Sequence, residues 1–346
     1  MIGNKFWLKI SLVIFFAALA SPLNPISAKT GHAEVGKSQS PLCLPQQTGP
    51  VSENCLLEGP ANYLARQESF GILLPRQKLT ALSVDSFLSE LPFNYIRLLD
   101  NETPLFGDLD SAMQNEDPYR IIPPGFKFAT YVDYYQGSGK GRHYMIAPGI
   151  WVRGSSVAGR VVPSDLTGLV FSRTPEKKFG CVISQVEIQT VPGDKDSLTG
   201  NLLGKFDVIQ VYSQAEVEGN SWLMIGPDEW IEKSKTALIY PAINPPEGVG
   251  DGRWIEINLM EQTVSAYQDG QLVFATVTST GIPGWWTRPG LFQIYEKLET
   301  TPMSGAFEAD RSDYYYLEDV PWTMYFDEAR ALHGTYWHDL FGYERS

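Results

Sequence analysis

The sequence predicts a mainly β protein built from two or three folding units. Its 346 residues exceed the ~150 residues that one domain usually has. The chain is 43% hydrophobic and 12% aromatic, and its 31 Gly and 24 Pro residues are spread along its length, a composition typical of globular, turn-rich β proteins. Helical periodicity is scarce and is confined mainly to a partly helical stretch around residues 62–91.

The formal net charge of -13 excludes polyanions as partners. The chain has no stripe of Lys and Arg that could neutralise phosphates, so we expect no contact with nucleic acid.

The amino terminus predicts export. Lys5 and Lys9 lie at the start of an apolar run, residues 10–20, and small residues follow at 18–20 and 26–28. This is the layout of a secretory signal, which we assign to residues 1–28, and it predicts an exported, extracytoplasmic protein. The run is shorter than the ~18 residues that a membrane span needs, although an uncleaved anchor with transient membrane association stays an alternative. Residues 29–60, rich in Ser, Pro, Gln and Gly, are expected to be a flexible linker.

Export gives the three cysteines a meaning. In an oxidising compartment Cys43 and Cys55 can close a small loop, and whether they pair stays open. Cys181 stands in an apolar run and is expected to be a buried strand residue. The alternative, a catalytic thiol, needs a nearby base, and no His is near it in the sequence.

The middle of the chain contains an internal repeat. Residues 145–152 are echoed 79 positions later by residues 224–231, so we expect two copies of one β unit. The second copy resembles a bacterial SH3-like domain at residues 204–208, 222–226 and 230–231. This implies two SH3-like β-barrel repeats, at 61–175 with an amino-terminal extension and at 176–241. Trp151 and Trp230 either cover the barrel cores or present an aromatic face to cell-wall peptide.

A Pro- and Gly-rich linker at 241–252 separates these repeats from a last unit at 250–346. Apolar residues at 255, 257 and 259 alternate with Trp254, Glu256 and Asn258, which predicts a half-buried strand. Residues 263–268 and 271–277 flank Asp269 and Gly270, a strong signal for a tight hairpin because both turn positions favour positive φ. A further strand is expected at 291–295.

The motifs of this last unit, taken in order, resemble the catalytic domain of the L,D-transpeptidase family. They lie at residues 254–259, 262–267, 269–270, 279–281, 287–294 and 333–334. The resemblance covers about 253–346 and implies a β-sandwich. In the family, a Ser-His-Gly-Cys motif follows the His-Gly pair and its Cys is the nucleophile. The sequence stops at Ser346, the first letter of that motif, so we expect an incomplete sandwich that lacks its nucleophilic Cys.

The resemblance implies exchange of peptidoglycan stem peptides through an acyl-enzyme. A thiolate attacks an amide carbonyl, a D-amino acid leaves, and the amine of a second stem peptide resolves the thioester. His333 is implied to be the general base and acid, and the backbone carbonyl of Gly334 to orient its ring.

Other residues of the last unit are weaker candidates. Trp285 and Trp286 either pack in the core or form a lid that shields the thioester, and they are candidates, with Tyr336, for substrate binding. His338 is expected at the surface or behind the site. No persuasive spacing of metal ligands occurs, so neither a metal nor another cofactor is expected.

Two functions from different classes compete. The first is an exported peptidoglycan L,D-transpeptidase of which the chain is a fragment, inactive as written. The second is a non-catalytic cell-wall-binding protein that uses the SH3-like repeats. The first is favoured, because half a sandwich would leave an unpaired strand edge and apolar surface.

Overall fold

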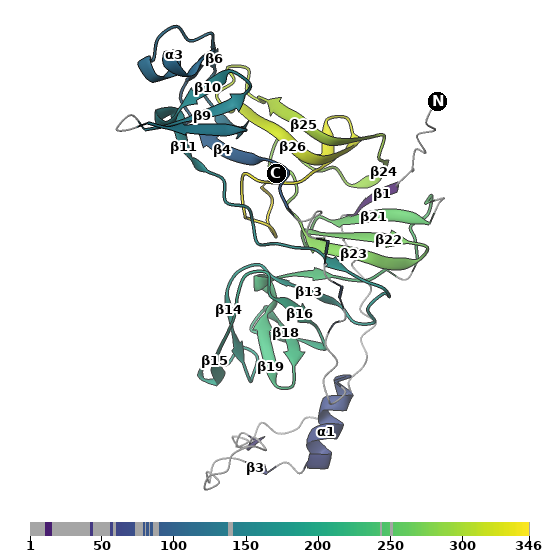
Figure 1. The fold of residues 1–346 in the computed structure, drawn as a ribbon. Coiled ribbons are helices and arrows are strands. Elements are labelled where there is room, and N and C mark those ends of the chain that lie inside the picture. Colours follow the sequence, from purple (N-terminus) through teal and green to yellow (C-terminus); the bar gives the residue numbers. More distant parts are fainter. Residues whose placement is uncertain are drawn as a thin grey trace. The chain divides into compact units, whose positions relative to one another are not determined.

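The computed structural model describes residues 11–15, 42–43, 56–57, 60–72, 79, 81–82, 84–85, 90–137, 141–242, 244–249 and 252–345. These residues are mainly β, as predicted (Figure 1). The chain divides into two compact units. Unit 1 comprises Met1–Phe15, Ala81–Thr174 and Ala242–Ser346, and unit 2 comprises Phe16–Thr80 and Pro175–Pro241. No helix in the described ranges is long and apolar enough to cross a membrane.

The first sheet of unit 1 contains the predicted hairpin. β22 and β23 are joined by Asp269 and Gly270, whose φ angles of 50° and 76° confirm the expected tight turn. The six strands lie in the order β12 (Leu169–Val170), β23 (Gln271–Val277), β22 (Thr263–Gln268), β21 (Arg253–Asn258), β1 (Ser11–Phe15) and β24 (Gly290–Gln293). β1 runs parallel to β21 and antiparallel to β24.

The second sheet of unit 1 joins parts of the chain that are distant in sequence. It contains β11 (Val157–Arg160), β4 (Asn94–Leu98), β7 (Phe126–Tyr131), β26 (Tyr315–Asp327) and β25 (Glu296–Gly305), and β27 (Arg330–Leu332) pairs with β26. The long strand β26 pairs in parallel with β7 at one end and with β27 at the other. Residues expected to form a first SH3-like repeat therefore share a sheet with the last segment of the chain.

The two sheets bury a common core. Ile255 and Ile257 of β21 pack in one cluster with Phe326 of β26 and with Leu332 of β27, which gives the sandwich that the resemblance implies. A half-buried strand would expose its opposite face to solvent, but the opposite face of β21 is covered. Trp254 is 3% exposed and stacks on Tyr267, so β21 is covered on both faces.

Unit 1 also carries smaller elements beside the second sheet. A three-stranded sheet orders β10 (Ile150–Arg153), β9 (Arg142–Ala147) and β8 (Asp133–Gln136). A two-stranded sheet pairs β5 (Thr103–Leu105) with β6 (Arg120–Ile122), and the short helix α3 (Leu109–Gln114) lies between them in sequence. The 3-10 helix η1 (Gly154–Ser156) precedes β11.

The described part of unit 2 contains a five-stranded sheet, a three-stranded sheet and the two-stranded sheet of β2 (Leu42–Cys43) and β3 (Leu56–Leu57). The first orders β15 (Leu198–Leu203), β14 (Val186–Gln189), β19 (Glu229–Glu232), β18 (Asn220–Gly226) and β17 (Ser213–Val217), and the second orders β16 (Val208–Gln210), β13 (Phe179–Val182) and β20 (Thr236–Ile239). The remaining elements are α1 (Pro60–Ser69), η2 (Lys195–Ser197) and η3 (Lys233–Lys235).

The repeated sequence forms a repeated structure. β10, η1 and β11 begin at Ile150, Gly154 and Val157, and β19, η3 and β20 begin 79 residues later in each case. Each copy is thus a hairpin, a 3-10 turn and a strand. The described strands close no barrel, so the SH3-like character of the two copies stays a prediction.

Most of the amino-terminal predictions fall outside the described residues. Of the expected signal, residues 1–28, only β1 is described, and Cys55 and most of the expected linker at 29–60 are not.

The join between β7 and β26 depends on a glycine. Gly125 has a φ of +143°, and a Cβ there would lie 2.2 Å from the carbonyl oxygen of Tyr314. That oxygen accepts the hydrogen bond from the Phe126 amide that begins the strand pairing. We therefore expect Gly125→Ala to lower the free energy of unfolding of unit 1 by about 2 kcal/mol or more in urea titrations. Gly159→Ala is the matched control, since a Cβ at Gly159 meets nothing within 4 Å. Equal stability of the two variants would contradict this role of Gly125.

Glu256 gives unit 1 a pH-dependent stability. Burial raises the pKa of this β21 carboxyl from 4.5 to about 7. The fold therefore favours the protonated form, and this stabilisation is complete below pH 4.5 and is lost as the pH rises to about 7. Glu256→Gln should therefore stabilise the protein by about 2–3 kcal/mol at pH 8 and change it little at pH 4. Denaturant unfolding at both pH values measures this. The same substitution at the exposed Glu299 should show no such difference, and a pH-independent effect of Glu256→Gln would refute the assignment.

Candidate functional site

The site begins where β27 ends. His333 directly follows Leu332, the last residue of β27, and its Nδ1 lies 3.2 Å from the carbonyl oxygen of Gly334. A carbonyl oxygen can only accept a hydrogen bond, so Nδ1 carries the hydrogen and Nε2 keeps its lone pair. The ring is thus fixed in the tautomer that can accept a proton at Nε2.

Burial also keeps His333 neutral. It lowers the pKa of the imidazole below 6.5, and the hydrogen bond to Gly334 opposes this only in part. The ring centroid of Trp337 lies 5.4 Å away and forms part of this apolar surrounding. A neutral imidazole with a free Nε2 near pH 7 is the form that a general base requires.

Gly334 is itself held by strand β26. Its amide donates to the carbonyl of Pro321 at 2.7 Å, and a Cβ at position 334 would lie 2.8 Å from Cγ of Pro321. Only glycine allows this close approach without displacing the proline. The backbone carbonyl that orients His333 is therefore placed by the sheet.

His333 opens on a large cavity within unit 1, with a volume of about 970 Å³. The walls come from the segments that precede β24, from β25, β26 and β27, and from residues outside the last segment. The lining residues include Ser279, Gly281, Trp285, Arg330, His333 and Arg345. Ser164, Leu166 and Thr167 add a wall from the stretch that leads into β12. A pocket of this size accommodates a peptide-sized ligand.

A buried glutamine positions the motif at residues 279–281. Gln262 is 5% exposed, and its amide donates to the hydroxyl of Thr280 at 2.9 Å and to the carbonyl of Leu259 at 2.7 Å. Its side-chain oxygen accepts from the Thr280 amide at 2.9 Å. This explains physically why residue 262 and the 279–281 motif occur together: one side chain ties the β21–β22 turn to the cavity wall.

The loop after Gly281 carries the two tryptophans. Trp285 is half-buried, lines the cavity and packs edge-on against Phe307 and Tyr315, with ring centroids at 5.5 and 5.6 Å. Trp286 is 51% exposed and does not line the cavity. The two residues therefore differ. Trp285 faces the cavity, and the backbone carbonyl of Trp286 accepts a hydrogen bond from Arg330.

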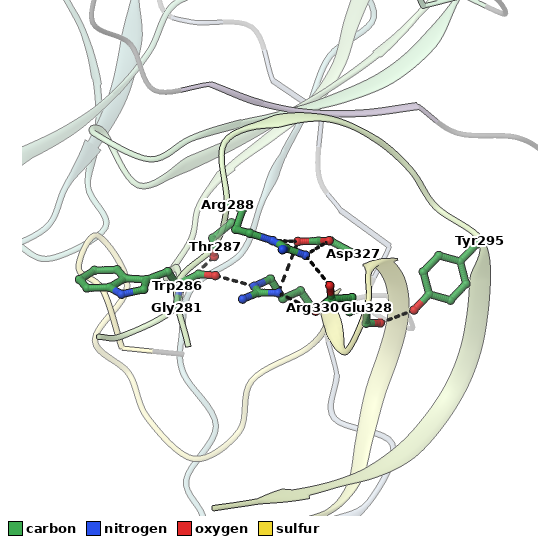
Figure 2. Close-up of polar contacts among 8 residues, drawn as sticks. All are labelled: Gly281, Trp286, Thr287, Arg288, Tyr295, Asp327, Glu328 and Arg330. Carbon is green, nitrogen blue, oxygen red and sulfur yellow. Dashed lines mark hydrogen bonds and ion pairs between the residues drawn. The ribbon is translucent and has the colours of Figure 1, made fainter. Parts of the chain in front are cut away.

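A network of charges anchors this loop beside β27 (Figure 2). Arg288 donates to the carboxylate of Asp327 through Nε at 2.7 Å and through Nη2. Oδ2 of the same carboxylate lies 3.5 Å from Nη1 of Arg330. Arg330 Nε donates to the carbonyl of Trp286 at 2.5 Å. The hydrogen bonds to Asp327 and Glu328 raise the pKa of Arg288 further. Sequence reasoning assigned nothing to Arg288 and did not find Asp327 or Arg330, since partners 39 residues apart show no spacing signal.

Tyr336 lies in the core. It is 3% exposed, stacks on Tyr95 with ring centroids 3.7 Å apart, and donates its hydroxyl to the carbonyl of Glu318 at 2.5 Å. Little of this ring is accessible, so a role of Tyr336 in substrate binding stays a prediction.

The remaining candidates lie elsewhere. Cys181 is buried in β13 of unit 2, and burial raises its pKa to about 12. His338 accepts a hydrogen bond at Nδ1 from the amide of Leu340. Among the described residues, no three His, Cys, Asp or Glu side chains gather as metal ligands would.

Comparison with known proteins identifies the segment that holds this site. Residues 252–346 match the YkuD family, the L,D-transpeptidase catalytic domain. No curated protein matches the chain. The match confirms the resemblance that the motifs indicated for this part of the chain, and it supports an L,D-transpeptidase-type function.

The state of His333 can be measured directly. In ¹⁵N-labelled protein at pH 7, we expect His333 to be neutral with its hydrogen on Nδ1, and its titration midpoint to lie below 6.5 because burial disfavours the charged ring. Nitrogen chemical shifts followed against pH test both points, and His333→Gln assigns the signal. A hydrogen on Nε2 at neutral pH, or a midpoint above 6.5, would rule out the proposed geometry.

Proposed function

We propose that the protein is a peptidoglycan L,D-transpeptidase in which His333 is the general base and acid. The observation that carries the proposal is the neutral imidazole, held at Nδ1 by Gly334 and bordering a cavity in the segment that matches the family.

The chemistry needs a thiol at this cavity. In the proposed cycle His333 Nε2 takes the thiol proton, the thiolate attacks the amide carbonyl, and the imidazolium returns the proton to the departing D-amino acid. The amine of a second stem peptide then attacks the thioester, gives its proton to Nε2 and releases the thiol. Cys181 does not suit this role, since it is 4% exposed and belongs to unit 2. The family pattern assigns the role to the Cys of a Ser-His-Gly-Cys motif, and no residue described here fills it.

We further propose that the cavity wall at Trp285 excludes water from the thioester. Exclusion of water favours attack by an amine over hydrolysis. Support comes from the position of Trp285, which packs between Phe307 and Tyr315 at the cavity and whose loop is tied to β27.

Export to the cell envelope is part of the proposal. It rests on the basic, apolar and small-residue order of residues 1–28 and on the extracytoplasmic position of peptidoglycan. A binding role for the repeated hairpin, 3-10 turn and strand is the second candidate. It is favoured by the duplication of that element, but it does not account for the geometry around His333.

The proposal is tested by acylation. Protein in which the 346 residues are followed by the Ser-His-Gly-Cys motif of the family should form a covalent adduct with a carbapenem, detected by intact-protein mass spectrometry. His333→Ala should slow adduct formation about 10²- to 10⁴-fold while retaining the circular dichroism of the parent, because a general base typically contributes a factor of this size.

The matched control is His338→Asn, which replaces the other histidine of this segment and should acylate like the parent. Normal acylation of a folded His333→Ala variant would sink the assignment of the base. An adduct on Cys181 would overturn the assignment of the cavity.

A further inference from the structure

Arg330 presents a partly occupied guanidinium to the cavity. Its Nε donates to the Trp286 carbonyl, and its Nη1 faces Asp327 at 3.5 Å and Glu328 at 3.7 Å. No described group lies within hydrogen-bonding range of Nη2. The side chain is 28% exposed and lines the same cavity as His333. The protein thus engages Nε and Nη1 of the guanidinium, and Nη2 remains available to a ligand.

The contacts of Nε and Nη1 hold the Arg330 side chain in place (Figure 2). Asp327, which receives Arg330, is 9% exposed and is held from its other side by the paired nitrogens of Arg288. Glu328 lies between the same two arginines, 3.2 Å from Arg288. A guanidinium held in this way loses little conformational freedom when it binds a further partner.

The fixed arginine differs from the other arginine of the cavity. Arg345 also lines the cavity, but its side chain is exposed. Its backbone amide donates a hydrogen bond to the carbonyl of Thr280 at 3.0 Å. A carboxylate is the partner that suits the remaining Nη2 of an immobilised guanidinium, because a hydrogen bond between two charged groups is stronger than one to a neutral oxygen.

We propose that Arg330 binds a carboxylate of the peptide substrate in the cavity beside His333 and so selects a free-acid peptide over its carboxamide. The inference rests on the proposed function for the identity of the peptide. It adds a specificity-determining residue three positions before the proposed base and outside the motifs that indicated the family.

Peptide binding tests the inference without chemistry. The 346-residue chain would be titrated by calorimetry with a synthetic peptidoglycan stem tetrapeptide in its free-acid form, and with peptides in which one carboxylate at a time is a carboxamide. One of these carboxamides should bind about tenfold more weakly than the free acid, the loss expected for a charge-assisted hydrogen bond. Arg330→Gln should weaken the free acid by the same factor and should not discriminate between the two peptides.

Two variants separate recognition from loosening of the loop. Arg288→Gln removes the support of Asp327 but leaves the donors of Arg330, so the ratio of the two affinities should be that of the parent protein. Arg345→Gln removes a charge from the same cavity and should also keep the ratio. Arg330→Lys keeps the charge without the planar fork and should recover only part of the discrimination.

The outcomes are distinguishable from those of the acylation test. Equal binding of all the peptides to the parent protein, no binding of the free acid, or discrimination that survives in folded Arg330→Gln would each overturn the role of Arg330. None of these results bears on carbapenem acylation through His333. Loss of acylation together with intact discrimination would instead leave Arg330 as a carboxylate site and remove the proposed reaction.

Discussion

Asp327 lies between two arginines at the end of β26, and the candidate site depends on this pairing. The carboxylate is 9% exposed, so removing either partner would leave a charge without full compensation in a poorly hydrated place. Arg288 comes from the loop that carries the tryptophans, and Arg330 begins the strand that leads to His333. One carboxylate therefore fixes two cavity walls with respect to each other, and this matters more for geometry than for stability.

Strand β26 carries this arrangement by being irregular. Asp319 and Trp322 have φ angles of 46° and 55°, and the pairing with β25 shifts register between Thr301 and Met303. Local kinks of this kind re-aim a strand. The same strand can thus pair with β7, offer the Pro321 carbonyl to Gly334 and end at Asp327. The tautomer of His333 is set by the backbone carbonyl of Gly334 and not by an acidic side chain.

Local patterns in the sequence predicted local structure well. The hairpin around Asp269 and Gly270 has the predicted strand bounds, because turn chemistry and alternation act over a few residues. The family motifs pointed to His333 and Gly334, which are in contact in the structure, and their catalytic roles stay predictions. What the local patterns did not show depended on distant contacts: Trp254 alternates with core residues but is itself covered, and Tyr336, a candidate for substrate binding, is 3% exposed. The charge network was missed because Arg288 lies 39 residues from Asp327, so no local pattern links the two residues.

The pairing of β7 with β26 limits where gene recombination can divide this protein. The family match begins at residue 252, yet β26 pairs with a strand from residues 126–131, and β12 extends the other sheet from residues 169–170. Gene recombination at residue 252 would separate strands from their hydrogen-bonding partners. The catalytic segment of this chain and residues 81–174 should accordingly be exchanged between proteins as one block, and chimaeras that divide them should be rare.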